Sequence, residues 1–144
     1  MSKKTTFKNL SQQYVFNLSS LYARMKFNSK LKQDVEKFKG YIILVEGKKD
    51  VHALKSLGFE KVYEIHKTSV SLRERIEEIC SNIERKERVC ILTDLDKKGK
   101  KLYMIIKPIL QEHGVRLDST LRGILIKSNL SHIEGLATFM NKLS

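Results

Sequence analysis

Residues 41–47 read Tyr-Ile-Ile-Leu-Val-Glu-Gly, a continuous apolar run that stops at an acid and a glycine. An apolar run of this length is typical of a strand that is covered on both faces, as strands of parallel sheets are. Glu46 therefore follows the carboxyl end of a predicted strand. In open parallel α/β sheets, ligands collect at this end of the strands. The stretch predicts an α/β fold with a ligand site near Glu46.

Downstream of this run, short apolar segments alternate with amphipathic helical patterns, which favours a parallel α/β sheet. Further strands are predicted over 62–65, 89–93 and 121–126. Helices are predicted from about Lys49 to Gly58, from a capping box at Ser71 and Glu74, through Leu102 to Leu110 with Gly114 as its stop, and from a second capping box at Ser131 and Glu134. Pro108 is expected to kink or split the third of these helices, because it removes a backbone donor.

Residues 1–39 differ from the rest of the chain. The first 40 residues carry nine basic and two acidic side chains, so they hold +7 of the formal net charge of +12. Apolar residues recur at helical spacing between Tyr14 and Met25 and between Leu31 and Phe38. We predict a basic helical extension over 1–39, as one helix or as two broken near residues 28–29, followed by a domain over 40–144.

The charge and composition narrow the class of partner. A net charge of +12 with a sequence pI near 9.7 attracts polyanions, so nucleic acid is the leading candidate and an anionic membrane surface the second. A lysine-rich surface that serves only solubility is the competing interpretation. No apolar run approaches the ~18 residues that cross a bilayer, so we expect no membrane span and a cytoplasmic location. Cys80 and Cys90 are expected to be buried free thiols.

Acidic side chains follow two of the predicted strands at equivalent points. Glu46 follows the first strand, and Asp94 and Asp96 follow the third. If these strands are neighbours, three carboxylates meet in one crevice, where a divalent cation relieves their mutual repulsion. Hard oxygen ligands favour Mg²⁺, with Mn²⁺ as an alternative, and phosphodiester oxygens could complete the metal's shell. The competing interpretation is that Asp94 and Asp96 only cap the following helix.

The two motifs together resemble those of the Toprim domain family, in which one strand ends in Glu-Gly with an Asp soon after, and a later strand ends in Asp-x-Asp-x-x-Gly. The chain offers Val45-Glu46-Gly47-Lys48-Lys49-Asp50 and Asp94-Leu95-Asp96-Lys97-Lys98-Gly99. The resemblance spans roughly residues 40–144 and implies a Rossmann-like sheet of about four parallel strands. The small size is most similar to stand-alone archaeal Toprim proteins and to the Toprim half of ribosomal-RNA maturation ribonucleases.

The resemblance also implies roles for individual residues. Glu46 would be the general acid or base, Asp94 and Asp96 would hold Mg²⁺, and Asp50 would support the catalytic group by orienting a neighbour. The remaining implied residues are the glycines Gly47 and Gly99, which would keep the turns beside the site tight. Lys98 stands where some members of the family carry a further acid. This departure counts against a second metal and against cleavage.

Six lysines surround the predicted site and suggest a track for nucleic-acid phosphates: Lys48, Lys49, Lys97, Lys98, Lys100 and Lys101. Four of them follow Asp94 at a predicted helix N-terminus, where cations oppose the helix dipole. A bound phosphate would offset that conflict, and this favours a functional role over a solvated charge run. Other polar residues are given no firm role: His52, His66, Arg73, Arg122 and His132.

Two functions are consistent with these features. The first is a Mg²⁺-dependent nuclease that cleaves phosphodiester bonds, with structured RNA favoured over DNA. The alternative is a non-catalytic nucleic-acid-binding module that acts with partner proteins in a DNA or RNA processing complex. A metabolic phosphotransferase is disfavoured, because the Gly-rich phosphate loop G-x-x-x-x-G-K-[ST] is missing from the sequence.

Overall fold

The computed structural model describes residues 30–128, 130, 132, 133, 135, 136 and 140. Within these residues the chain forms a four-stranded sheet in the order β2-β1-β3-β4. Its strands are β1 (Ile42–Val45), β2 (Val62–Glu64), β3 (Arg88–Ile91) and β4 (Arg116–Leu117). Every strand pairing is parallel, which confirms the predicted α/β fold with about four parallel strands.

β1 lies between β2 and β3 and is buried on both faces. Its four side chains are at most 2% exposed. Ile43 pairs with Val62 of β2 on one side and with Cys90 of β3 on the other. Because successive side chains of a strand point to opposite faces, Ile43 and Val45 join one apolar cluster while Ile42 and Leu44 join a second. The uninterrupted apolar run is therefore what a strand in this position needs.

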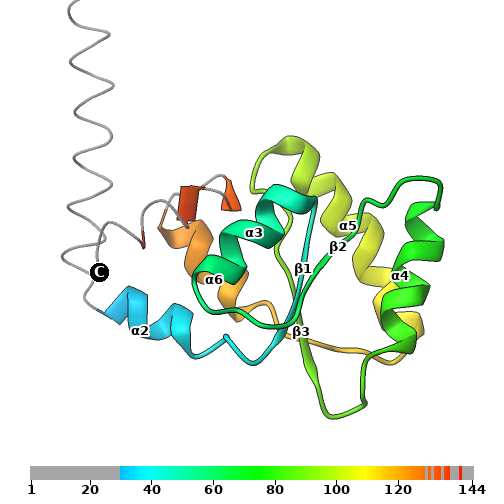
Figure 1. The fold of residues 1–144 in the computed structure, drawn as a ribbon, viewed down its shortest axis with the longest axis horizontal. Helices are drawn as coiled ribbons and strands as arrows, with labels where there is room; N and C mark the ends of the chain where they lie inside the picture. The colour runs from blue at the N-terminus through cyan, green and yellow to red at the C-terminus, as the bar shows by residue number, and fades with distance from the viewer. Residues whose placement is uncertain (1–29, 129, 131, 134, 137–139, 141–144) are drawn as a thin grey trace, which may run out of the picture.

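Helices cover both faces of the sheet (Figure 1). The cluster that contains Ile43 is completed by α2 (Lys30–Glu36), α3 (Lys48–Ser56) and α6 (Thr120–Lys127). The cluster that contains Ile42 is completed by α4 (Leu72–Ser81) and α5 (Lys97–Glu112). The domain therefore consists of three layers, with the sheet in the middle.

Local signals in the sequence set several helix boundaries. The hydroxyl of Ser71 accepts a hydrogen bond from the N–H of Glu74 at 3.1 Å, so Ser71 is the N-cap of α4 as predicted. Gly58 follows α3 with a φ of 97°, and Gly114 follows α5 with a φ of 69°. Glycine adopts this left-handed conformation at little cost, which explains why both helices end there.

The fourth strand does not lie where the sequence analysis placed it. Residues 121–126 were predicted to form a strand, but they belong to α6, and β4 is the two-residue segment Arg116–Leu117. Leu121 and Leu125, four residues apart, face the core, while Ile126 is 53% exposed. A short apolar run fits a buried strand and a buried helix face equally well, which is why the prediction was wrong.

Pro108 does not split α5, which runs through it as one helix of 16 residues. Proline cannot donate a hydrogen bond to the carbonyl of Met104, one turn earlier. Both residues lie on the exposed side of the helix, where water can satisfy that carbonyl. The exposure of this face makes the proline tolerable.

Part of the predicted extension belongs to the packed core. Leu31, Val35 and Phe38 are each at most 7% exposed and share the cluster that contains Leu121 and Leu125. The predicted helical pattern before residue 30, and the capping box at residues 131 and 134, lie outside the described residues. The boundary between residues 39 and 40 stays a prediction. Among the helices described, none has both the length and the apolar character needed to cross a bilayer.

Candidate metal centre

The order of the strands indicates that a ligand would bind at the edge of the sheet that is formed by the carboxyl ends of its strands. The chain passes from β1 outward to β2, and then returns to the other side of β1 to form β3 and β4. Ligands of open α/β sheets bind beyond the carboxyl ends of the strands at such a switch point, here between β1 and β3. Glu46 directly follows β1 and Asp94 follows β3, and both are half-buried. The fold thus carries both predicted acids to that edge.

A hydrogen bond joins the two strand ends. The main-chain N–H of Asp94 donates to Oε2 of Glu46 at 2.8 Å, although the residues lie 48 positions apart. The pairing of Leu44 with Ile91 brings the strand ends into reach of each other. The Glu46 carboxylate is therefore placed at the beginning of the loop that carries Asp94 and Asp96.

The two aspartates each bind a main-chain N–H through Oδ1. Asp96 is the N-cap of α5 and accepts from Gly99 at 2.8 Å. Asp94 accepts from the N–H of Ile133 at 3.1 Å. The capping interpretation therefore holds for Asp96. These bonds also fix the orientation of both carboxylates, as a site that binds a ligand requires.

His132 completes a compact group of donors with the two aspartates. Its Nε2 lies 3.6 Å from Oδ2 of Asp96. One potential ligand atom from each of Asp94, Asp96 and His132 lies within 4.8 Å of the others. Among the described residues, these three form the group of side chains that could together hold a metal ion. Glu46 contacts the main chain of Asp94 and is not part of that group. Sequence reasoning gave His132 no role, because no spacing rule connects position 132 with positions 94 and 96.

The glycine that follows the second acidic motif is required by a close backbone contact. A Cβ at Gly99 would lie 1.9 Å from the carbonyl oxygen of Asp94. The carbonyl of Gly99 also accepts a hydrogen bond from the buried hydroxyl of Thr93 at 2.7 Å. The loop 93–99 is therefore tight, and this contact explains why glycine stands where the resemblance predicted a turn residue.

Gly47 and Asp50 form the beginning of α3. Gly47 is the N-cap in an extended conformation, and a Cβ there would meet no atom within 4 Å. Its N–H donates to Oδ2 of Asp50 at 3.4 Å. Asp50 therefore holds the turn after Glu46 by a hydrogen bond, which is a geometry that suits the supporting role that the resemblance implied.

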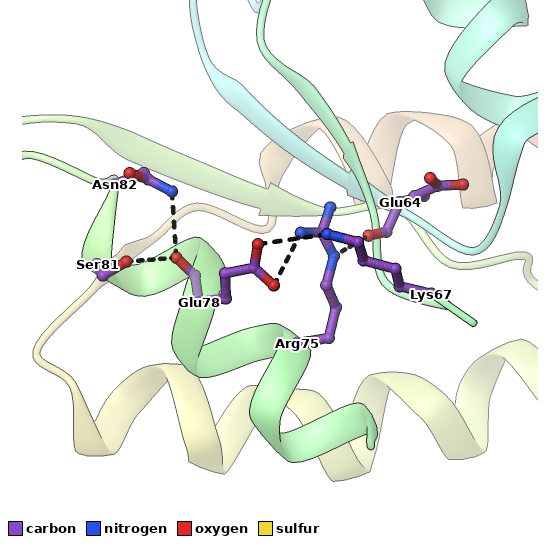
Figure 2. A network of polar contacts seen from close by, with 6 residues as sticks. All are labelled: Glu64, Lys67, Arg75, Glu78, Ser81 and Asn82. Atoms are coloured by element: carbon purple, nitrogen blue, oxygen red, sulfur yellow. Dashed lines mark hydrogen bonds and ion pairs between the residues drawn. The ribbon is translucent and has the colours of Figure 1, made fainter. Parts of the chain in front are cut away.

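A polar network holds the loop after β2 against α4, and the same loop contacts the residue that follows β1. Figure 2 shows Arg75 of α4 reaching from Glu78 to the carbonyl of Glu64, to which its Nε donates at 2.9 Å. Lys67 pairs with the same Glu78 carboxylate at 3.4 Å. The N–H of His66, in this loop, donates to the carbonyl of Glu46 at 3.3 Å. The network thus contributes to fixing the backbone that carries Glu46.

A buried arginine braces the other strand end. Arg122 of α6 is 7% exposed, and its Nη1 donates to the carbonyl oxygen of Thr93 at 2.6 Å. Burial lowers the pKa of Arg122, while Tyr103, Asp94 and Glu46 act in the opposite direction. Sequence reasoning gave this residue no firm role, although an arginine inside an apolar run is a signal, since buried arginines are rare unless they are paired.

The six predicted lysines all lie exposed. Lys48 and Lys49 begin α3, and the other four lie in the first turns of α5, which starts at Lys97. No ion pair between described residues involves any of the six. Their charge is therefore not neutralised by a neighbouring carboxylate, and it surrounds the edge at which Glu46 and Asp94 meet.

Comparison with known proteins connects this site with a family. The Toprim domain family matches residues 41–120, which contain both acidic motifs. A UPF0292 protein of Methanosarcina barkeri is 31% identical over 110 residues, which cover 73% of this chain and 73% of that protein. A UPF0292 protein of Thermococcus sibiricus is 34% identical over 109 residues, covering 74% and 82% respectively.

A solved structure supports the same assignment. A protein from Aquifex aeolicus superimposes with a TM-score of 0.62 at 29% identity, covering 75% of this chain and 96% of that one. The sequence relatives are small archaeal proteins, as the resemblance to stand-alone archaeal Toprim proteins predicted. The family match covers more than half of the chain, and the sheet carries both motifs at the carboxyl ends of neighbouring strands. The chain therefore belongs to the Toprim domain family.

Proposed function

We propose that the chain is a Mg²⁺-dependent nucleic-acid-binding protein that cleaves phosphodiester bonds, with RNA favoured over DNA. The observation that carries this proposal is the 2.8 Å hydrogen bond from the N–H of Asp94 to Glu46, which brings acids from two strand ends to the switch point of the sheet. Membership of the Toprim family supports metal binding and a function connected with nucleic acids.

The donor set at this edge suits a divalent cation. Carboxylate oxygens are the ligands that Mg²⁺ prefers, and it is bound through one or two carboxylates together with phosphate oxygens of a substrate. Asp94 and Asp96 would hold the ion, since their ligand atoms lie in one group. When bound, Mg²⁺ supplies neutralisation of the charge that develops on the phosphoryl oxygens.

The chain's own residues would divide the remaining tasks. Glu46, held at the end of β3 by the N–H of Asp94, would take up or deliver a proton at the reacting phosphodiester. Arg122, behind the site, would offset part of the negative charge of the acids. The exposed lysines of α3 and α5 would bind backbone phosphates on either side of the reacting group, without regard to sequence.

Conservative substitutions test the nuclease directly. Glu46→Gln and Asp94→Asn remove a charge but keep the oxygen that accepts the N–H of Asp94 or of Ile133. We expect each to abolish metal-dependent cleavage of labelled structured RNA while leaving the thermal unfolding curve in place. Glu60→Gln, which changes an exposed acid just before β2 at the opposite edge of the sheet, is the matched control. Cleavage by either site variant at the wild-type rate would remove this mechanism.

A non-catalytic binding module is the second candidate function. It is favoured by the structural roles of both aspartates, since Asp96 caps α5 and Asp94 accepts a hydrogen bond from the N–H of Ile133. Lys98 also stands where some family members carry a further acid. In this case the protein binds RNA or DNA in a salt-sensitive manner, within a processing complex, and produces no cleavage with Mg²⁺ or Mn²⁺. Metal-dependent cleavage by homogeneous protein, lost in Glu46→Gln, would exclude it.

A further inference from the structure

His132 lies beside the two aspartates of the proposed metal site, and its imidazole has no part in the function proposed above. We propose that His132 is a nitrogen ligand of the metal at this centre. It would shift the preference of the site from Mg²⁺ toward Mn²⁺ and the divalent ions of iron, nickel, copper and zinc. This inference rests on the proposed function, because it requires that Asp94 and Asp96 bind a metal.

The distances permit a shared ion. Nε2 of His132 lies 3.6 Å from Oδ2 of Asp96, and the ligand atoms of all three residues lie within 4.8 Å of one another. Ligands at about 2.0–2.2 Å from one ion are separated by at most about 4.4 Å. The 4.8 Å within which the three ligand atoms lie exceeds this limit by only a few tenths of an ångström, so a small movement is enough to place all three on one ion. The side chain of His132 is 59% exposed, so it has room for this movement while Asp96 keeps its hydrogen bond to Gly99.

The backbone around His132 is held at the site from both sides. Ile133, the next residue, donates its N–H to Asp94, and its side chain is 2% exposed. Leu130, two residues earlier, is 7% exposed in the same core cluster. A histidine between two anchored positions is delivered to the aspartates by the fold. An exposed histidine on an open helix face has no such constraint.

The chemistry of the donors gives the direction of the preference. Carboxylates alone suit Mg²⁺ and Ca²⁺, whereas imidazole suits zinc, iron, nickel and copper. A set of two carboxylates and one imidazole lies between these classes, and Mn²⁺ accepts both kinds of ligand. The competing interpretation is a plain contact between Asp96 and a protonated His132, which at this exposure contributes little to stability. The two interpretations differ in what a bound metal touches.

Mn²⁺ is the probe that separates them, because its electron spin reports the nuclei of its ligands. The full chain is titrated with Mn²⁺, the free ion is measured by continuous-wave EPR, and the bound ion is examined by pulsed EPR for the modulation of a directly coordinated imidazole nitrogen. Mg²⁺ affinity is measured by competition. The variants are His132→Ala and, as a matched control, His113→Ala. His113 follows the last turn of α5, about 24 Å along the helix from Lys97.

We expect nitrogen modulation in the wild type and in His113→Ala and none in His132→Ala. Loss of the ligand should weaken Mn²⁺ binding about tenfold or more, as removal of supporting groups does at other metal sites, and change Mg²⁺ binding about twofold at most. Tight Mn²⁺ binding without nitrogen modulation in the wild type would overturn this inference and leave the carboxylate site standing. Failure of the wild type to bind Mn²⁺ would overturn both. Unfolding curves of the variants show whether each has kept the fold.

Discussion

The guanidinium of Arg122 lies 4.5 Å from the centre of the Tyr103 ring while its Nη1 donates to the carbonyl oxygen of Thr93 at 2.6 Å. The same nitrogen lies 3.1 Å from the hydroxyl of Thr93. One planar cation thus connects α6, α5 and the end of β3. Its Nη2 lies 3.5 Å from the carbonyl oxygen of Asp94. Arginine can stack on a ring and donate from several nitrogens at once, which lysine cannot do.

We therefore predict that Arg122→Lys destabilises the protein even though the charge is kept. Loss of the stacking and of well-directed hydrogen bonds to a buried carbonyl should cost about 1–3 kcal/mol in the free energy of unfolding, measured with urea. Arg85→Lys, at an exposed position before β3, should change it by less than about 0.5 kcal/mol. Equal stability of Arg122→Lys and wild type would show that the brace is not needed.

The contact between Gly99 and Asp94 predicts a large effect from one methyl group. In Gly99→Ala the new Cβ would lie 1.9 Å from the Asp94 carbonyl oxygen, so the loop must move. We expect a loss of about 2–3 kcal/mol, in the range of overpacked sites, together with weaker Mn²⁺ binding. Gly123→Ala in α6 is the contrast, since a Cβ there meets no atom within 4 Å. That change should stabilise the protein by about 0.5–1 kcal/mol, because alanine is the better helix former.

The lysines at the start of α5 predict a change in the salt dependence of nucleic-acid binding. The slope of log K against log salt concentration falls by about 0.7–0.9 for each phosphate contact that is lost. Lys97→Gln with Lys98→Gln should therefore reduce the slope by about 1.5 units. Lys55→Gln with Lys86→Gln removes the same charge near the opposite edge of the sheet. An equal change in both double variants would mean that only net charge matters.

The two cysteines should differ in their reaction with thiol reagents. Burial raises the pKa of Cys90 to about 12, and burial together with Glu77 raises the pKa of the half-buried Cys80. A raised pKa lowers the fraction of reactive thiolate at pH 8. We expect a maleimide to modify native Cys80 more slowly than free cysteine, and to modify Cys90 only after unfolding. A Cys80→Ser variant isolates the second thiol, and rapid labelling of this variant in the native state would contradict the prediction.

The strands that carry the acids could be predicted from sequence because their signal is local. The run Tyr41–Val45 is apolar without interruption, which is what a strand covered on both faces needs, and Glu46 marks its end. The third strand gives the same signal before Asp94. The sequence left open whether the two strands are neighbours, and the strand order β2-β1-β3-β4 shows that they are.

The parts that could not be predicted depend on packing between distant segments. The run 121–126 has the same apolar residues whether it forms a helix or a strand, and only the core that receives Leu121 and Leu125 decides for α6. His132 reaches Asp96 because Ile133 binds Asp94, and no local pattern records that contact. Capping and metal binding by Asp96 need the same residue type, so the sequence alone left both interpretations open.

The bond between Glu46 and the main chain of Asp94 also bears on how the chain avoids misfolding. Every side chain of β1 is apolar, so a slip of one residue against β3 would exchange the strand's two faces while still burying hydrocarbon on both. Such a slip would move the Glu46 carboxylate away from the Asp94 N–H. Glu46, which is proposed to act in the reaction, would then also disfavour a shifted register, because its hydrogen bond to Asp94 forms only in the native one. In Glu46→Leu we expect more buried apolar surface and a less specific pairing of β1 with β3.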